Sequence, residues 1–319
     1  MAKSLQEYAA WLDTRDDLIW PQPPPFASAK AKPSIKPIAG IKAVAWNLYG
    51  TLIRITDGSL MLLHFKEMRM QVALEKTINE FNMWNSMTRR PGAPWEYMLQ
   101  KYRGILEDME LAGNVQPGDF PQPSSTKIWR HLLGMLEQKE YDYDHQFYGD
   151  MDELAEKVAY FFQSCLQGVE ASPHAVKALT SVAQAGLAQG LLADAQPHSL
   201  LQALRVFGAQ DKLPPLNNLL DPACLVLSHQ IGIRKPSASL FHACVQRFAA
   251  KGIQPEEILY VSNQLQGDLA IAKQLGMRTV LYAGDKTTLK ATGPEIRHPE
   301  LRPKRLLTDL EQIRLLISG

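Results

Sequence analysis

The sequence predicts an α/β protein built on a Rossmann-like, doubly wound parallel sheet, with a helical segment inserted after the first strand. A short apolar run at 43–46 reads as a buried strand. Residues 56–169 carry helical spacing and lack strand patterns. From Glu170 onward, helical patterns alternate with short apolar runs, and this alternation is typical of βα units around a parallel sheet.

Composition excludes several classes of protein. The 319 residues include 34 Lys and Arg against 33 Asp and Glu, so no net field attracts nucleic acid or an anionic membrane. The cysteines (Cys165, Cys224 and Cys244) lie far apart, without the spacing of a zinc site or a disulfide framework. No signal core and no apolar run of ~20 residues is found. We therefore expect a cytoplasmic protein with neither nucleic acid nor membrane as its partner.

Residues 1–40 form an N-terminal arm. Apolar residues at helical spacing predict a short amphipathic helix near its start, and two proline-rich stretches at 20–26 and 30–37 predict an extended tether. Two interpretations remain open, a strap along the protein's own surface and a partner-binding peptide. The aromatic side chains of the arm require burial in either case.

The segment 56–169 predicts a helical insertion. Its helices are expected over 60–81, 94–111, 125–136 and 151–166. Its large apolar side chains are expected to form a hydrophobic core rather than a ligand pocket. They are Met68, Met70, Trp84, Trp95, Met98, Trp129 and Met135.

The ranges 41–55 and 170–319 predict the α/β core. Further strands are expected at 189–193, 224–228, 258–261 and 279–282. Helices are expected between them, including one over 268–275 that Gly276 closes and a last one over 307–317.

Polar clusters stand directly after four of the predicted strands. Because parallel strands end at the same edge of a sheet, these clusters are expected to meet there in one site. In chain order the clusters are Asn47, Tyr49, Gly50 and Thr51; Ala193 and Asp194; Lys235; and Ser262, Asn263 and Asp268.

The four clusters in this order resemble the motifs of the haloacid dehalogenase (HAD) superfamily of phosphotransferases. N-L-Y-G-T-L at 47–52 is similar to the family's D-x-D-G-T-L, and S-H-Q-I-G-I-R-K-P at 228–236 resembles its third motif. V-S-N-Q-L-Q-G-D-L-A-I-A-K-Q-L-G-M at 261–277 resembles the fourth. The resemblance implies a HAD-like core, with the helical insertion in the place of the family's cap domain.

The resemblance also shows what this sequence lacks. The family's nucleophile is an aspartate, because an amide is a far weaker nucleophile, and Asn47 stands at that position. Tyr49, with a reference pKa of about 10, stands at the acid/base position. The phosphate-binding hydroxyl of the second motif is replaced by Ala193, beside an Asp194 that would repel phosphate.

By the same resemblance, substrate contacts fall on Gly50, Thr51, Ala193, Asp194 and Lys235, and Lys235 also counts among the catalytic positions. The metal positions are Asp268 and Asn263, and Mg2+ requires hard anionic oxygens. Lys235 and Asp268 have an alternative role as a structural salt bridge, which we favour. Asp194 and His198 could form a relocated acid/base pair, although an Asp capping the following helix is commoner.

Two functions therefore remain open. The first is a non-catalytic or diverged HAD-like protein that needs no cofactor. It would bind a small anionic ligand or a protein partner through the cleft, the cap or the proline-rich arm. The second is a HAD-like hydrolase or phosphatase with an altered Mg2+-dependent site. We favour the first, because losing a nucleophile alone costs many orders of magnitude in rate.

Overall fold

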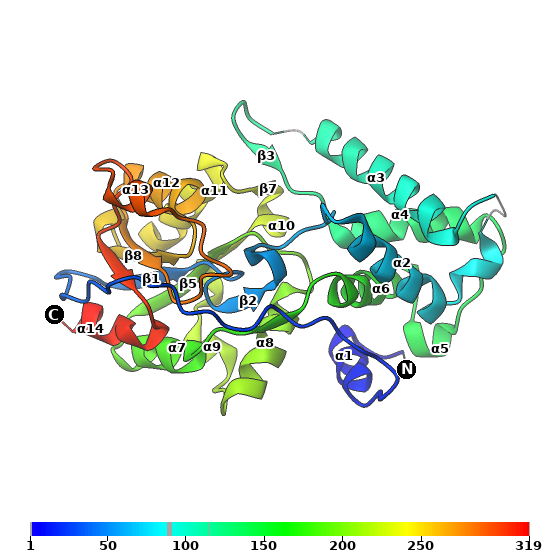
Figure 1. The fold of residues 1–319 in the computed structure, drawn as a ribbon, viewed down its shortest axis with the longest axis horizontal. Coiled ribbons are helices and arrows are strands. Elements are labelled where there is room, and N and C mark those ends of the chain that lie inside the picture. Colours follow the sequence, from blue (N-terminus) through cyan, green and yellow to red (C-terminus); the bar gives the residue numbers. More distant parts are fainter. Residues whose placement is uncertain (1, 88–90, 114, 319) are drawn as a thin grey trace.

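The computed structural model describes residues 2–87, 91–113 and 115–318. The chain forms a core around a parallel sheet and a helical insertion beside it (Figure 1). The sheet has six parallel strands in the order β10-β9-β8-β1-β5-β6, which confirms the predicted α/β class. The strands are β1 (Ala43–Trp46), β5 (Ala188–Ala193), β6 (Leu225–Leu227), β8 (Ile258–Ser262), β9 (Arg278–Tyr282) and β10 (Arg305–Leu307).

Helices cover both faces of the sheet, so the central strand β1 is buried on each side. Val44 and Trp46 face one hydrophobic cluster, while Ala43 and Ala45 face the other. The first face is covered by α7 (Ala175–Gln184), α8 (Ser199–Gln210), α9 (Leu216–Leu219) and α14 (Ile313–Ile317). The second is covered by α11 (Ala238–Ala249) and α12 (Ala270–Gln274). The remaining short helices of the core are α10 (Ser228–Ile231) and α13 (Gly293–Arg297).

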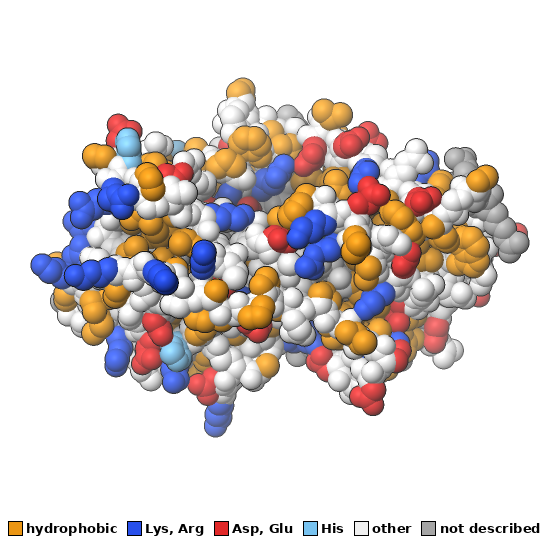
Figure 2. Space-filling view, viewed as in Figure 1, with side chains coloured by type: hydrophobic (Ala, Val, Ile, Leu, Met, Phe, Trp, Pro, Cys, Tyr) orange, Lys and Arg blue, Asp and Glu red, His pale blue; other side chains and the backbone are white. Residues whose placement is uncertain are grey.

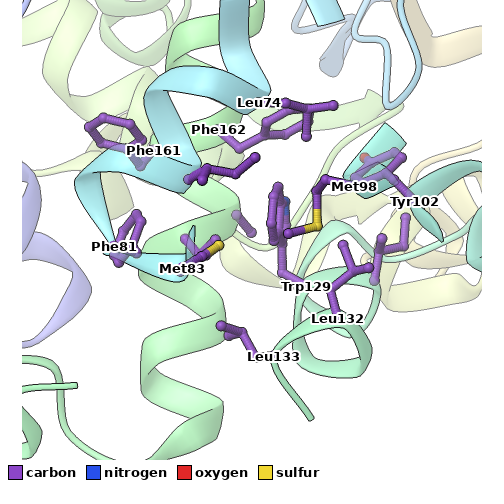
Figure 3. Close-up of a cluster of buried hydrophobic side chains, with 14 of the residues drawn as sticks. Leu74, Phe81, Met83, Met98, Tyr102, Trp129, Leu132, Leu133, Phe161 and Phe162 are labelled. Carbon is purple, nitrogen blue, oxygen red and sulfur yellow. The ribbon is translucent and has the colours of Figure 1, made fainter. Parts of the chain in front are cut away.

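The helical insertion has its own hydrophobic core, in which aromatic rings pack edge to face (Figure 3). The Trp129 ring lies 5.1 Å from Phe162 and 6.0 Å from Tyr102. The helices are α2 (Glu67–Glu80), α3 (Pro94–Ala112), α4 (Ser125–Glu137), α5 (His145–Tyr148) and α6 (Met151–Leu166).

The prediction that the large apolar side chains of the insertion are core residues is only partly correct. Met70, Met98 and Trp129 are buried as predicted. Met68 is 75% exposed and Trp84 42% exposed, whereas Trp95 and Met135 are half-buried. Met68 lies two positions from buried Met70 on α2, which places the two side chains on different sides of that helix.

The chain enters and leaves the insertion through one antiparallel pair, formed by β2 (Ile53–Ile55) and β4 (Val169–Ala171). A second contact between insertion and core is made by β3 (Phe120–Pro121), which pairs with β7 (Ile233–Arg234). The loop that carries Lys235 is therefore attached directly to the insertion.

The arm contacts both parts of the molecule. Its helix α1 (Leu5–Asp13) packs on the insertion, where Tyr8 and Trp11 meet the ring of Phe147. The chain then runs across to the core as an extended segment, the blue trace in Figure 1. There the backbone N–H of Ser34 donates to Leu306 O, and that of Ile38 donates to Leu316 O, both at 2.8 Å.

Three predicted helices differ from the structure. The range 60–81 is helical only from Glu67, in α2, and residues 60–66 form no helix. The range 307–317, expected as one helix, begins inside β10, because its first residue pairs with β9, and only later turns into α14. The range 268–275 opens on a π-helical turn at Leu265–Leu269, so Asp268 lies on a wider turn than predicted. Short 3-10 turns occur at Thr56–Gly58, Met83–Ser86, Pro222–Cys224, Pro255–Glu257 and Leu310–Gln312.

Charge is distributed unevenly along the molecule. The helical insertion, residues 56–169, contains 17 Asp and Glu against 11 Lys and Arg. Figure 2 shows Lys and Arg side chains gathered at the opposite end, over the core. Among the residues that the structure describes, no helix is long and apolar enough to cross a membrane.

Candidate functional site

The first polar cluster continues β1 at the carboxyl edge of the sheet. Asn47 is 3% exposed, and its backbone N–H donates to Val261 O of the neighbouring strand at 2.9 Å. Gly50 follows with φ +84°, and a Cβ there would lie 2.3 Å from Nδ2 of Asn263. Only glycine therefore allows this loop to close against the fourth cluster.

The side-chain amide of Asn47 lies at the centre of the site. Its Nδ2 donates to the backbone carbonyl of Tyr49 at 2.8 Å and to Oδ1 of Asn263 at 3.0 Å. Its Oδ1 accepts from Nζ of Lys235 at 2.9 Å. The carbonyl can only accept and the ammonium can only donate, so these two partners fix the orientation of the amide.

Lys235 and Asp268 form a buried ion pair on one side of Asn47. Nζ of Lys235 lies 2.8 Å from Oδ2 of Asp268, and the same oxygen accepts from the hydroxyls of Tyr260 and Ser262 at 2.9 and 2.5 Å. Burial raises the pKa of Tyr260, which therefore remains a donor. Among the described residues, Oδ1 of Asp268 has no hydrogen-bond partner. The charge of Asp268 is thus balanced by Lys235.

Asn263 and Thr51 lie on the other side of Asn47. The backbone N–H of Asn263 donates to Oγ1 of Thr51 at 3.0 Å, and that hydroxyl donates to Oδ1 of Asn263 at 3.2 Å. The amide nitrogen of Asn263 donates to Thr288 O at 2.6 Å. The side chain of Asn263 therefore serves to connect three loops.

These residues do not fit a magnesium ion. Tyr49 O and Oδ1 of Asn263, which would be among the oxygens available to such an ion, both accept from the amide nitrogen of Asn47. Oδ2 of Asp268 is already paired with Lys235. Among the described residues, the group of His, Cys, Asp and Glu side chains close enough to hold a metal is His174, Asp309 and Glu311, none of which belongs to the four clusters.

The side chain of Tyr49 points away from Asn47. Its hydroxyl lies 2.9 Å from Oγ of Ser199 and donates to Oε1 of Gln202 at 2.6 Å, both on α8. Burial raises its pKa above the usual value. The structure therefore brings the backbone of Tyr49 into the site and packs its ring against the core.

Asp194 stands at the end of β5, and its Oδ1 accepts from the backbone N–H of Lys235 at 2.9 Å. It caps this loop rather than a helix. His198 is buried, and neither ring nitrogen has a hydrogen-bond partner among the described residues. Burial lowers the pKa of His198 to about 3, so the ring stays neutral. Asp194 and His198 do not form the hydrogen-bonded acid/base pair that their spacing suggested. Ala193 is buried beside Asp194 and offers no side-chain donor.

A cavity of about 380 Å3 opens between the insertion and the core beside these loops. Asp194 and Arg234 contribute to its wall from the core. The opposite wall consists of 59–63, Leu106 and Glu110. Arg234 crosses the cavity to pair with Glu110 at 3.0 Å.

Several of these partners could not be predicted from the sequence. Tyr260 lies inside a strand, where an aromatic residue is ordinary core material. Thr288 and the cavity residues 59–63 belong to segments without a motif. Only Ser262 could have been expected from its position, because it stands directly before Asn263 at a strand end.

Comparison with known proteins agrees with this geometry. A family model described as HAD-hydrolase-like matches residues 232–313. A glyceraldehyde 3-phosphate phosphatase from Methanopyrus kandleri is 38% identical over 56 residues, which is 18% of this chain and 23% of the phosphatase.

Solved structures resemble the fold at low sequence identity. A 2-haloacid dehalogenase from Pseudomonas syringae pv. Tomato is 17% identical with a TM-score of 0.50, over 86% of this chain and 96% of that one. A HAD phosphatase from Thermococcus onnurineus is 16% identical with a TM-score of 0.45, over 86% and 97%. A HAD-type hydrolase from Bacillus subtilis, bound to magnesium, is 14% identical with a TM-score of 0.44, over 88% and 99%.

The sheet order and the four clusters at one edge give the chain a HAD-like α/β fold. Within that fold, residues 232–313 match the HAD-hydrolase-like family model.

Proposed function

We propose that this protein performs no aspartyl-phosphate chemistry and uses its HAD-like core and the neighbouring cavity for binding. The proposal rests on one observation: the amide of Asn47 bonds to Tyr49 O and Asn263 through its nitrogen, and to Lys235 through its oxygen. The side chain at the nucleophile position thus has its hydrogen-bonding groups engaged by the protein.

Chemistry supports the same conclusion. Attack on phosphorus needs an anionic oxygen, and an amide oxygen that accepts from an ammonium has little electron density to give. Tyr49 does not act as a general acid toward Asn47, because its hydroxyl bonds to α8. Lys235, which would otherwise neutralise a phosphate, already neutralises Asp268.

A second candidate is an Mg2+-dependent phosphatase with an altered site. The local similarity to a glyceraldehyde 3-phosphate phosphatase and the retained Lys235 and Asp268 favour it. This candidate requires ligands other than those that the family uses.

Hydrolysis of p-nitrophenyl phosphate with Mg2+ separates the two candidates. We expect the natural protein and Asn47→Ala to be equally inactive. Activity in the natural protein that disappears in Asn47→Ala would refute the proposal and establish the phosphatase. Asn218→Ala, at an exposed position of the α/β part of the chain, serves as the control. A contaminating phosphatase would give the same activity in all three preparations.

A further inference from the structure

The two sides of the cavity between insertion and core differ in polarity. The insertion side is mostly apolar, because half-buried leucines at 60, 62 and 63 and buried Leu106 line it, although Ser59 and Glu110 also belong to that side. The other side carries Asp194, Gln196 and Arg234. A ligand that fills this space therefore meets an apolar surface at one end and polar groups at the other.

Most polar groups of the wall already have protein partners. Gln196 accepts from the backbone N–H of Ser125 at 2.8 Å and donates to Pro123 O at 2.9 Å. Gln122 accepts from the hydroxyl of Ser228 at 2.7 Å. The guanidinium of Arg234 donates to Glu110 and to Pro121 O.

Asp194 differs from these groups. Its Oδ1 accepts from the backbone N–H of Lys235, but within the described part of the chain its Oδ2 accepts no hydrogen bond. This oxygen is also partly exposed rather than fully buried, and Asp194 lines the cavity. An acceptor with a negative charge is thus open to the cavity.

Nearby cations do not satisfy this carboxylate. The side chain of Lys235 bonds to Asn47, Tyr260 and Asp268, and Arg234 is paired with Glu110. Lys290 donates to Oγ of Ser59 at 2.8 Å. The pKa of Asp194 is raised by burial despite the opposing charges of Lys235 and Arg234.

We propose that the cavity binds a small organic ammonium ion, whose charged head bonds to Oδ2 of Asp194 and whose apolar body lies on the leucines of the insertion. A phosphate is disfavoured there, because it would meet the same carboxylate and no hydroxyl at Ala193, while Lys235 and Arg234 are already paired with carboxylates. This inference deepens the proposed function and rests on it. The ligand class is the opposite of the anion that the family resemblance suggested.

Isothermal titration calorimetry of the full chain with three hexyl compounds tests the inference. Hexylammonium chloride, hexanol and hexyl phosphate share one apolar body and differ only in the charge of the head. We expect hexylammonium to bind at least about tenfold more tightly than hexanol, because it gains one charge-assisted hydrogen bond. We expect hexyl phosphate to bind most weakly of the three. Equal affinity for hexylammonium and hexanol, tightest binding of hexyl phosphate, or no binding of hexylammonium would each overturn it.

Asp194→Asn gives the matched variant. The amide oxygen can still accept from the backbone N–H of Lys235, while the charge is removed. Hexylammonium affinity is expected to fall about tenfold and hexanol affinity to stay unchanged. Asp16→Asn makes the same charge change on an exposed residue of the arm and should not alter either affinity. An equal loss in both variants would also contradict the proposal.

The outcome of the binding experiment can be distinguished from that of the phosphatase assay. Failure of hexylammonium to bind, with no hydrolysis of p-nitrophenyl phosphate, overturns the ligand class and leaves the non-catalytic proposal standing. Hydrolysis that depends on Asn47 overturns the proposed function itself, whatever the hexyl compounds do.

Discussion

Lys235 and Asp268 form an ion pair of 2.8 Å in which the two side chains are 5% and 0% exposed. The pair joins the loop after β7 to the π-helical turn after β8, and two further hydroxyls complete the surroundings of Asp268. A charge this deeply buried is tolerated only while its partner is present.

Lys235→Met should therefore destabilise the fold by about 3–5 kcal/mol, because it leaves the charge of Asp268 without a partner. Urea denaturation measures the change in the free energy of unfolding. The double variant Lys235→Met with Asp268→Asn should recover part of the loss, because the uncompensated charge is gone.

Lys251→Met is the control for this pair. Lys251 pairs with Asp221, but the two side chains are 38% and 27% exposed, so the expected cost is much smaller. Equal costs for Lys235→Met and Lys251→Met would show that the buried pair is not specially important.

Restoring carboxylates should create a metal site. Asn47→Asp with Tyr49→Asp replaces the amide hydrogens that face Tyr49 O and Asn263 by anionic oxygens. We expect Mg2+ affinity, measured by calorimetry, to increase about tenfold or more, which corresponds to about 1.4 kcal/mol. Most of the gain should come from Asn47→Asp alone, because the side chain of Tyr49 points to α8. Asn218→Asp adds the same charge on the surface, and an equal gain there would contradict the assignment of the site.

Asp194 should make stability depend on pH in a defined direction. Burial raises its pKa, so the folded state holds the proton more tightly than the unfolded state. This carboxyl favours folding below the usual carboxyl pKa of about 4 and opposes folding increasingly as the pH rises through its folded pKa. Asp194→Asn should thus match the natural protein in acid and be more stable at neutral pH. Urea titrations across this pH range without ligand check it, and a constant difference at every pH would refute it.

Arg54 should hold the arm on the core. Its side chain is 3% exposed, pairs with fully buried Asp285 and donates to Pro24 O of the arm at 2.5 Å. Arg54→Met should cost about 3–5 kcal/mol and speed proteolysis within 20–30, because it leaves Asp285 unpaired and releases the arm. Arg130→Met removes an exposed pair with Asp152 and should leave the cleavage rate unchanged. Cleavage at the same rate in both variants would contradict this role.

The sequence predicts the core well, because each strand is a short apolar run that ends at a polar cluster. β1, β5, β6, β8 and β9 agree with the predicted ranges to within about two residues, the usual uncertainty of element ends. Strand β10 was missed, because Arg305–Leu307 is brief and runs into a helical pattern. Its strand character comes from pairing with β9, a contact that periodicity does not encode.

The residues of the site could be predicted from the sequence, but the contacts between them could not. The order of motifs placed Asn47, Lys235, Asn263 and Asp268 at one edge of the sheet. Which atom of Asn47 faces Lys235, or that Tyr49 points to α8, depends on contacts between residues far apart in the chain. The exposure of Met68 has the same origin, since a helical stripe shows which residues share a face and not which face is covered.

The arm joins the insertion and the core, in addition to the two strand pairs that connect them. Two crossings are the β2–β4 pair and the β3–β7 pair, and the third is the arm, held by α1 on one side and by 34–38 on the other. The arm is therefore a third connection between the insertion and the core, and amide hydrogen exchange at Ser34 and Ile38 reports how often it detaches from the core.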